Sequence, residues 1–165
     1  MTELPEAAAR GAGRRPEDAA AFVDFLECAN NEYRSDAIYE IFAANARSVM
    51  ITDGAREESV GVHAIHDAWS TTCATFRACR FRLEKILVIA TDDTIVNEWR
   101  GGPHGRRDGC GVEVWRFDDQ RKVIDQRSYN YLKIRSPLHP IQALRLFLGS
   151  PSMTVAAAWL KIRRR

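Results

Sequence analysis

Glu113 is the side chain of this sequence whose setting best suits acid–base chemistry. It lies between Val112 and Val114, in a run where polar and apolar residues alternate. The two-residue period of a β-strand places it on the same face as Trp115 and Phe117. A carboxyl group beside aromatic rings loses solvation, which favours its protonated form and makes it a candidate general acid or hydrogen-bond donor. The alternative is a strand glutamate that faces solvent or a neighbouring arginine.

Polar residues on the neighbouring predicted strands recur with the same period. Asn97 precedes Trp99 by two residues, and Gln126, Ser128 and Asn130 alternate along the last strand. Amide and hydroxyl groups on one face of a sheet can orient a polar ligand. They can equally satisfy one another in an internal hydrogen-bond network. Both interpretations place these residues on the inner face of a sheet.

A second group of ionisable residues surrounds a predicted hairpin and the helix after it. Asp53 and Glu58 lie at the hairpin, and turn geometry alone explains an aspartate before a glycine. His63 and His66 are three residues apart on one side of the helix, a spacing that can bind metal. No matching acid or third ligand follows on that helix, so we predict no metal site and consider His63 as a proton shuttle at a pocket mouth.

The elements that must position these residues follow from periodicity, caps and turns. Pro16 and the acids after it open a helix, and Ser35 is the expected N-cap of a second, short one. Alternating β-branched and aromatic residues predict strands. The expected helices are residues 16–31, 35–42 and 61–75, and the expected strands are residues 46–52, 57–60, 77–90, 94–101, 109–117 and 122–132.

Composition indicates one ordinary globular domain. The chain has 165 residues, 45% of them hydrophobic, a net charge of +2 and no apolar run long enough to span a bilayer. Residues 1–15 lack the apolar segment of a secretory signal and are expected to be a disordered leader. The four cysteines are scattered without zinc spacing, which is typical of reduced thiols in a cytoplasm. We therefore expect a cytoplasmic protein.

This order of elements resembles the nuclear transport factor 2-like superfamily, in particular its SnoaL-like branch with ketosteroid isomerases, polyketide cyclases and limonene-epoxide hydrolases. The resemblance covers about residues 16–132. It rests on Asp36-Ala-Ile-Tyr-Glu-Ile-Phe-Ala, Gly61-Val-His-Ala-Ile, Val114-Trp-Arg-Phe-Asp-Asp and Lys122-Val-Ile-Asp-Gln-Arg-Ser-Tyr. It implies an α+β fold, also called cystatin-like, in which a cone-shaped, curved mixed sheet wraps around three N-terminal helices. These segments are fold signatures, because the superfamily includes enzymes, transport factors and proteins of no known activity.

The resemblance also bears on the candidate residues. Glu113 matches the strand position where ketosteroid isomerases hold the protonated acid of the oxyanion hole. Asn97 and Ser128 match the two catalytic aspartates of the limonene-epoxide hydrolases, and neither can take a proton as a carboxylate does. Met50 and Leu26 fall near the isomerase general base and oxyanion-hole tyrosine. Neither specific activity is therefore supported by the residues present.

Residues 136–165 form a basic extension beyond the resemblance. From Gln126 onward the chain carries eight Lys or Arg residues and no acid. Helices are expected at residues 140–148 and from Ser152 to the C-terminus. Their apolar surface is expected to pack on the domain or on a second subunit, and the alternative is an anionic membrane surface. No recognised motif supports nucleic-acid binding.

These observations predict three segments: a leader at residues 1–15, a domain at residues 16–135 and the extension at residues 136–165. We expect a homodimer through the outer sheet face, as in many relatives, and a pocket for a small hydrophobic, steroid- or polyketide-like molecule. If catalytic, the protein would perform acid–base chemistry without a cofactor, with Glu113 as acid and Asn97 and Ser128 orienting the substrate. Trp99, Trp115, Gln126, Asn130, His63 and Asp53 are the expected ligand contacts. The alternative is a non-catalytic interaction module.

Overall fold

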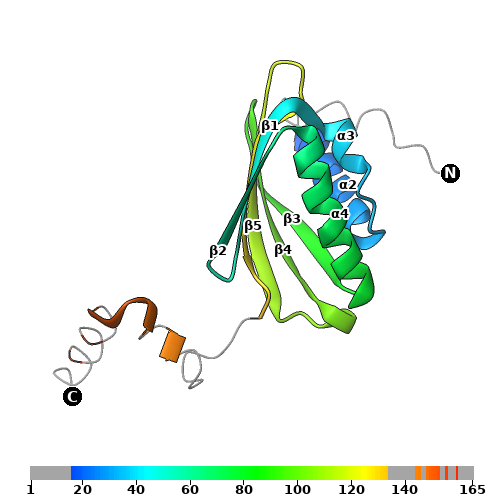
Figure 1. The fold of residues 1–165 in the computed structure, drawn as a ribbon. Helices are drawn as coiled ribbons and strands as arrows, with labels where there is room; N and C mark the ends of the chain where they lie inside the picture. The colour runs from blue at the N-terminus through cyan, green and yellow to red at the C-terminus, as the bar shows by residue number, and fades with distance from the viewer. Residues whose placement is uncertain (1–15, 134–143, 146–147, 153–154, 156–158, 160–165) are drawn as a thin grey trace. The chain divides into compact units, whose positions relative to one another are not determined.

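The computed structural model describes residues 16–133, 144–145, 148–152, 155 and 159 (Figure 1). The chain divides into two units, Met1–Lys133 and Ile134–Arg165, which are described separately. The expected leader lies outside the described residues, and so does most of the basic extension. Among the residues described, no helix is long and apolar enough to cross a membrane.

Three helices lie on one face of the sheet in the first unit (Figure 1). They are α2 (Pro16–Asn31), α3 (Ala37–Ile41) and α4 (Val62–Ala78). Helix α2 buries an apolar face with helical spacing, since Phe22, Val23 and Leu26 are almost fully enclosed. The predicted helices are thus confirmed, with α4 ending three residues later than expected, at Ala78.

The sheet is mixed and has six strands in the order β2-β1-β6-β5-β4-β3. The strands are β1 (Phe42–Thr52), β2 (Ala55–Val60), β3 (Arg82–Ala90), β4 (Thr94–Gly102), β5 (Gly109–Phe117) and β6 (Val123–Tyr131). Strands β1 and β6 pair in parallel, and all other pairs are antiparallel. The predicted hairpin and four-strand meander are therefore confirmed, and a short 3₁₀ helix, η1 (Pro103–Gly105), connects β4 to β5.

The main core lies between α2 and the inner face of the sheet. The Phe22 ring meets the edge of Trp115 at 5.5 Å and of Phe117 at 5.2 Å between ring centroids. Trp115 is fully buried in this core. A smaller cluster of Phe81, Leu83 and Trp99 lies toward the end of α4, with Phe76 packed against it. Leu83, Trp99 and Phe76 of this smaller group also line a cavity on the inner face of the sheet.

Several predicted boundaries were wrong where the chain reverses direction. The strand expected from residue 77 begins at Arg82, because α4 continues to Ala78 and Arg80 turns the chain with φ 49°. The first strand begins at Phe42 rather than residue 46, since Phe42 pairs with Val123 ahead of a bulge. Strand β2 begins at Ala55 rather than residue 57.

The expected cap of the short helix was also wrong. Asp36, not Ser35, occupies the N-cap of α3, and its side chain makes no capping hydrogen bond. Ser35 accepts a backbone hydrogen bond from Ile38 at 3.2 Å, which a one-turn helix can use in place of a side-chain cap. Burial of Ile38 and Ile41 holds this helix instead.

Candidate functional site

A cavity of about 420 Å³ lies between α4 and the inner face of the sheet. Its size falls within the range of small-molecule sites, which are concave and mostly apolar with a few polar groups. Its apolar wall comes from Met50, Trp69, Phe76, Leu83, Trp99 and Leu132. Its polar lining includes Glu113, Gln126, Ser128 and Asn130, four of the candidate residues named from the sequence.

Glu113 is held in the cavity wall by two donors from neighbouring strands. Lys85 Nζ on β3 donates to Glu113 Oε2 at 2.5 Å, and Asn97 Nδ2 on β4 donates to the same oxygen at 2.9 Å. The Lys85 side chain is 0% exposed and that of Glu113 is 10% exposed. Among the described residues no group donates to the other oxygen, Oε1. Glu113 therefore lines the cavity with one carboxylate oxygen, Oε1, that receives no hydrogen bond from the described residues.

Lys85 was missed by the sequence analysis, although its position carried a signal. It lies between Leu83 and Leu87 on the inward face of β3, where a lysine interrupts an apolar alternation. Its backbone amide donates to Glu27 Oε2 on α2 at 2.6 Å, which joins the strand to the helix. A buried ammonium group is costly unless a carboxylate pairs with it, so an inward-facing lysine indicates a buried acidic partner. Glu113 is that partner.

Asn97 lies behind the cavity rather than in its lining. It is fully buried, and its two amide ends are both used. Nδ2 donates to Glu113, and Oδ1 accepts from Trp115 Nε1 at 2.8 Å. Trp115 belongs to the core against Phe22, so these two predicted site residues support Glu113 from behind. Their arrangement connects the core to the cavity wall.

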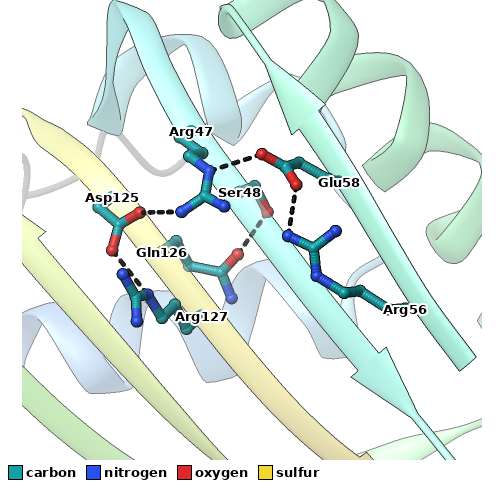
Figure 2. A network of polar contacts seen from close by, with 7 residues as sticks. All are labelled: Arg47, Ser48, Arg56, Glu58, Asp125, Gln126 and Arg127. Atoms are coloured by element: carbon teal, nitrogen blue, oxygen red, sulfur yellow. Dashed lines mark hydrogen bonds and ion pairs between the residues drawn. The ribbon is translucent and has the colours of Figure 1, made fainter. Parts of the chain in front are cut away.

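A second polar network lies along β6, the strand on which Ser128 pairs with Glu113. Asn130 Oδ1 accepts from Trp99 Nε1 at 3.0 Å and from Ser128 Oγ at 2.8 Å. Ser48 Oγ donates to Gln126 Oε1 at 2.5 Å (Figure 2). Among the described residues nothing accepts from the Gln126 amide nitrogen, so the cavity also presents one unused donor. The internal network that we considered as an alternative is thus present, and it leaves groups free on the cavity side.

The residues around the β1–β2 hairpin lie away from the cavity. Asp53 is an exposed turn residue with φ 48°, and neither it nor Glu58 lines the cavity. Glu58 lies on the outer face, where Arg47 Nε donates to its Oε1 at 2.6 Å and Arg56 to its Oε2 (Figure 2). Hydrogen bonds from Arg47 and then Arg56 lower the pKa of Glu58 to about 2. Glu57, on the alternate face, lines the cavity and was not predicted.

His63 and His66 gather around Tyr39 at the junction of α3 and α4. His63 Nδ1 is 3.3 Å from the Tyr39 hydroxyl, and the His66 ring stacks on Tyr39 at 4.5 Å. His66 Nε2 is also 3.1 Å from Asp36 Oδ1. Neither histidine lines the cavity. Within the described part of the chain, no group of three His, Cys, Asp or Glu residues could hold a metal ion.

A curved mixed sheet with helices on its inner face defines the nuclear transport factor 2-like, or cystatin-like, class of α+β protein. A family model, the SnoaL-like domain, matches residues 20–124 of the chain. The chain therefore belongs to the SnoaL-like domain family, as its sequence predicted. No curated protein matches the chain significantly in sequence.

Solved structures with low sequence identity share this fold. A SnoaL-like protein of unknown function from Burkholderia thailandensis is 20% identical, with a TM-score of 0.57 over 70% of this chain and 97% of that one. An NTF2-like protein of unknown function from Mesorhizobium loti is 17% identical, with a TM-score of 0.57 over 72% and 95%. A steroid delta-isomerase from Pseudomonas aeruginosa is 16% identical, with a TM-score of 0.52 over 88% and 99%. These likenesses establish the fold.

Proposed function

We propose that this SnoaL-like protein binds a small hydrophobic molecule, steroid- or polyketide-like, between α4 and the sheet and performs acid–base chemistry on it without a cofactor. The observation that carries the proposal is the position of Glu113, whose side chain lines the cavity while Lys85 and Asn97 hold Oε2. Trp69, Trp99 and Phe76 supply flat apolar walls. The steroid isomerase with the same fold supports the substrate class.

Glu113 is the group that would move a proton. Two donors fix its carboxylate, so Oε1 is pre-oriented toward a substrate proton in the cavity. The Lys85 ammonium supplies a counter-charge to the carboxylate in the low-dielectric interior. Isomerisation, dehydration, cyclisation and hydration each need such a group to accept a proton and return it. Ser128 and Gln126 on β6 would orient the substrate, and Asn97 would position Glu113.

The substitution Glu113→Gln tests this proposal. A screen of steroids, terpenoids and aromatic polyketides for ligand-induced increases in melting temperature first identifies a binder, since a ligand at 100 times its Kd adds about 2.7 kcal/mol of stability. We expect Glu113→Gln to abolish turnover of that binder, because an amide cannot accept the proton. Glu58→Gln, the same change on the outer face, is the matched control and should leave turnover unchanged. Equal affinity and turnover in both variants would contradict the assignment.

A second candidate function is a non-catalytic interaction module that uses the C-terminal unit. Its described apolar residues Leu144, Leu148, Val155 and Trp159 are all at least half exposed. The sequence of this unit contains six Lys or Arg residues and no Asp or Glu. Exposed apolar side chains next to basic ones favour contact with an anionic membrane surface.

Co-sedimentation with vesicles tests this second function. The full chain should bind vesicles that contain phosphatidylserine more strongly than vesicles of phosphatidylcholine alone, and Trp159→Glu should weaken that binding. Binding that depends on neither the lipid charge nor Trp159 would rule out the membrane contact. A cytoplasmic location remains a prediction. Contact with an anionic membrane would place the protein at the cytoplasmic surface of that membrane.

A further inference from the structure

The charged groups of the cavity are unevenly distributed. Among its lining residues only Glu57 and Glu113 are ionisable, and both are acidic. No lysine, arginine or histidine is among them. Lys85 lies behind Glu113 with a side chain that is 0% exposed, so its ammonium compensates Glu113 without being offered to a ligand. A ligand therefore meets carboxylate oxygens and no cation.

Glu113 offers a ligand a hydrogen-bond acceptor, and the unused donor in the lining, the Gln126 amide, carries no charge that would compensate an anion. Glu113 Oε1 has no donor among the described residues, while Lys85 and Asn97 both donate to Oε2. Trp99 and Leu83, which also line the cavity, are nearly fully buried, so this part of the cavity is poorly solvated. A second negative charge placed beside Glu113 would be desolvated and would meet no cation, because Lys85 is enclosed behind Glu113 and paired with it. A hydroxyl group, in contrast, can donate to Oε1 without adding charge.

We propose that the cavity selects an uncharged apolar molecule with a hydroxyl group that donates to Glu113 Oε1, and that it rejects carboxylates of the same carbon skeleton. This inference rests on the proposed function and names the ligand class of that site. A protonated amine gains less than its charge suggests, because Lys85 already neutralises the same carboxylate at 2.5 Å. Glu57 adds a further negative charge against an anion.

Three small aromatic probes with the same carbon skeleton test whether the cavity prefers a hydroxyl group to a carboxylate. The Kd values of 2-naphthalenemethanol, 2-naphthoic acid and 2-naphthylmethylamine are measured at neutral pH by isothermal titration calorimetry on the full chain. We expect the alcohol to bind at least about tenfold more tightly than the acid, the scale on which an unpaired polar group in a site discriminates. The amine should bind no more tightly than the alcohol.

Glu113→Gln gives a second, independent result. Without the carboxylate, the Lys85 ammonium loses its partner next to the cavity, so 2-naphthoic acid should bind more tightly than to the wild type and the alcohol less tightly. Glu58→Gln should reproduce the wild-type values. If Glu113→Gln does not fold, the double variant Lys85→Gln with Glu113→Gln removes both charges and should reduce the discrimination to within about threefold.

The outcomes separate the inference from the proposed function. Equal binding of alcohol and acid, tighter binding of the acid, or tighter binding of the amine than the alcohol would overturn the selection while leaving a functional apolar cavity. Binding of none of the three probes would overturn both. An acid that gains no affinity in Glu113→Gln, or a preference for the alcohol that persists in the double variant, would also overturn the assigned role of Glu113.

Discussion

Lys85 and Glu113 depend on one another for their place in the interior. Each would be costly to bury alone, because an isolated charge in a low-dielectric environment lacks the solvation that water gives it. Their contact at 2.5 Å and the hydrogen bond from Asn97 to the same carboxylate satisfy both charges. A pair of this kind adds little net stability compared with apolar residues, so its presence beside a cavity points to a functional use.

The substitution Lys85→Met is predicted to destabilise the protein by about 3 kcal/mol, because it leaves the Glu113 carboxylate without its buried counter-charge. Urea unfolding at neutral pH measures the loss in the free energy of unfolding. The control is Arg107→Met, which breaks the ion pair between Arg107 and Glu84. Glu84 lies on β3, next to Lys85. Both of those side chains are more than half exposed, so its cost should stay below about 1 kcal/mol. Similar costs for both variants would contradict the burial of the Lys85–Glu113 pair.

The lowered pKa of Glu58 predicts that this residue contributes to the stability of the protein in a pH-dependent way. Its pKa is lowered from 4.5 to about 2 in the folded protein, chiefly by the hydrogen bond from Arg47. A carboxyl group with a lowered folded pKa stabilises the protein above its unfolded pKa, and this contribution is lost as the pH falls through the folded value. The stability difference between wild type and Glu58→Gln should therefore shrink between about pH 4.5 and pH 2.

Urea unfolding across that pH range, repeated on an Arg47→Met background, checks the cause. Arg47 supplies the largest part of the pKa shift, so the pH dependence should be smaller without it. An unchanged pH profile on that background would show that Arg47 is not the cause. Arg56, the second donor to Glu58, would then be the candidate.

At the scale of the element, strand alternation decides which residues reach the cavity. On β2, Glu57 faces the cavity and Glu58 the outer face, so two adjacent glutamates have different surroundings. On β3 the same alternation turns Lys85 inward between two leucines. On β5, a glycine at position 111 leaves room for the Trp99 ring of the neighbouring strand. The backbone pattern thus positions both the charges and the aromatic wall.

Gly111→Ala is predicted to destabilise the protein by about 2 kcal/mol, because overpacking forces neighbouring groups to move. A Cβ at this position would lie 2.6 Å from the Tyr129 carbonyl oxygen and would clash with the Trp99 indole. Since Trp99 lines the cavity, the variant should also weaken ligand binding. Thermal unfolding with and without a binder measures both effects. Gly149→Ala, where nothing lies within 4 Å of the added Cβ, is the matched control.

At the scale of the whole molecule, the outer face of the sheet in the first unit is the surface on which we expect a partner to bind. No described helix covers it (Figure 1). It carries exposed Ile86 and Val88 on β3 and Tyr129 and Tyr131 on β6. Apolar side chains gathered on one open face are typical of an interaction surface. A second copy of the chain is the partner that we propose.

Sedimentation-velocity centrifugation tests this proposed homodimer. The wild type should sediment as a dimer at micromolar concentration, and Tyr129→Glu should shift it toward the monomer by placing unpaired charge in the interface. A wild type that is monomeric throughout would refute the dimer. A dimer that tolerates Tyr129→Glu would place the interface elsewhere.

The sequence alone determined the class of fold and which polar residues share a strand face. The reason is that helix caps, strand alternation and turn residues are local signals, and each acts within a few positions of the chain. Alternation grouped Glu113 with Trp115 and grouped Gln126 with Ser128 and Asn130, but it left open whether Glu113 faced inward or faced solvent. The errors in the element boundaries lie where local signals compete. One example is the end of α4, which continues to Ala78, past the predicted end at residue 75, before the chain turns at Arg80.

Only the tertiary structure decided which side chains meet. Lys85 and Glu113 are far apart in sequence, and their contact depends on the register of β3 on β4 and of β4 on β5, which no local pattern specifies. The same registers put Asn97 behind Glu113 and turned Trp115 into the core. Strand pairing sets these distances through long-range packing, and for that reason the charge of the cavity could be known only from the folded chain.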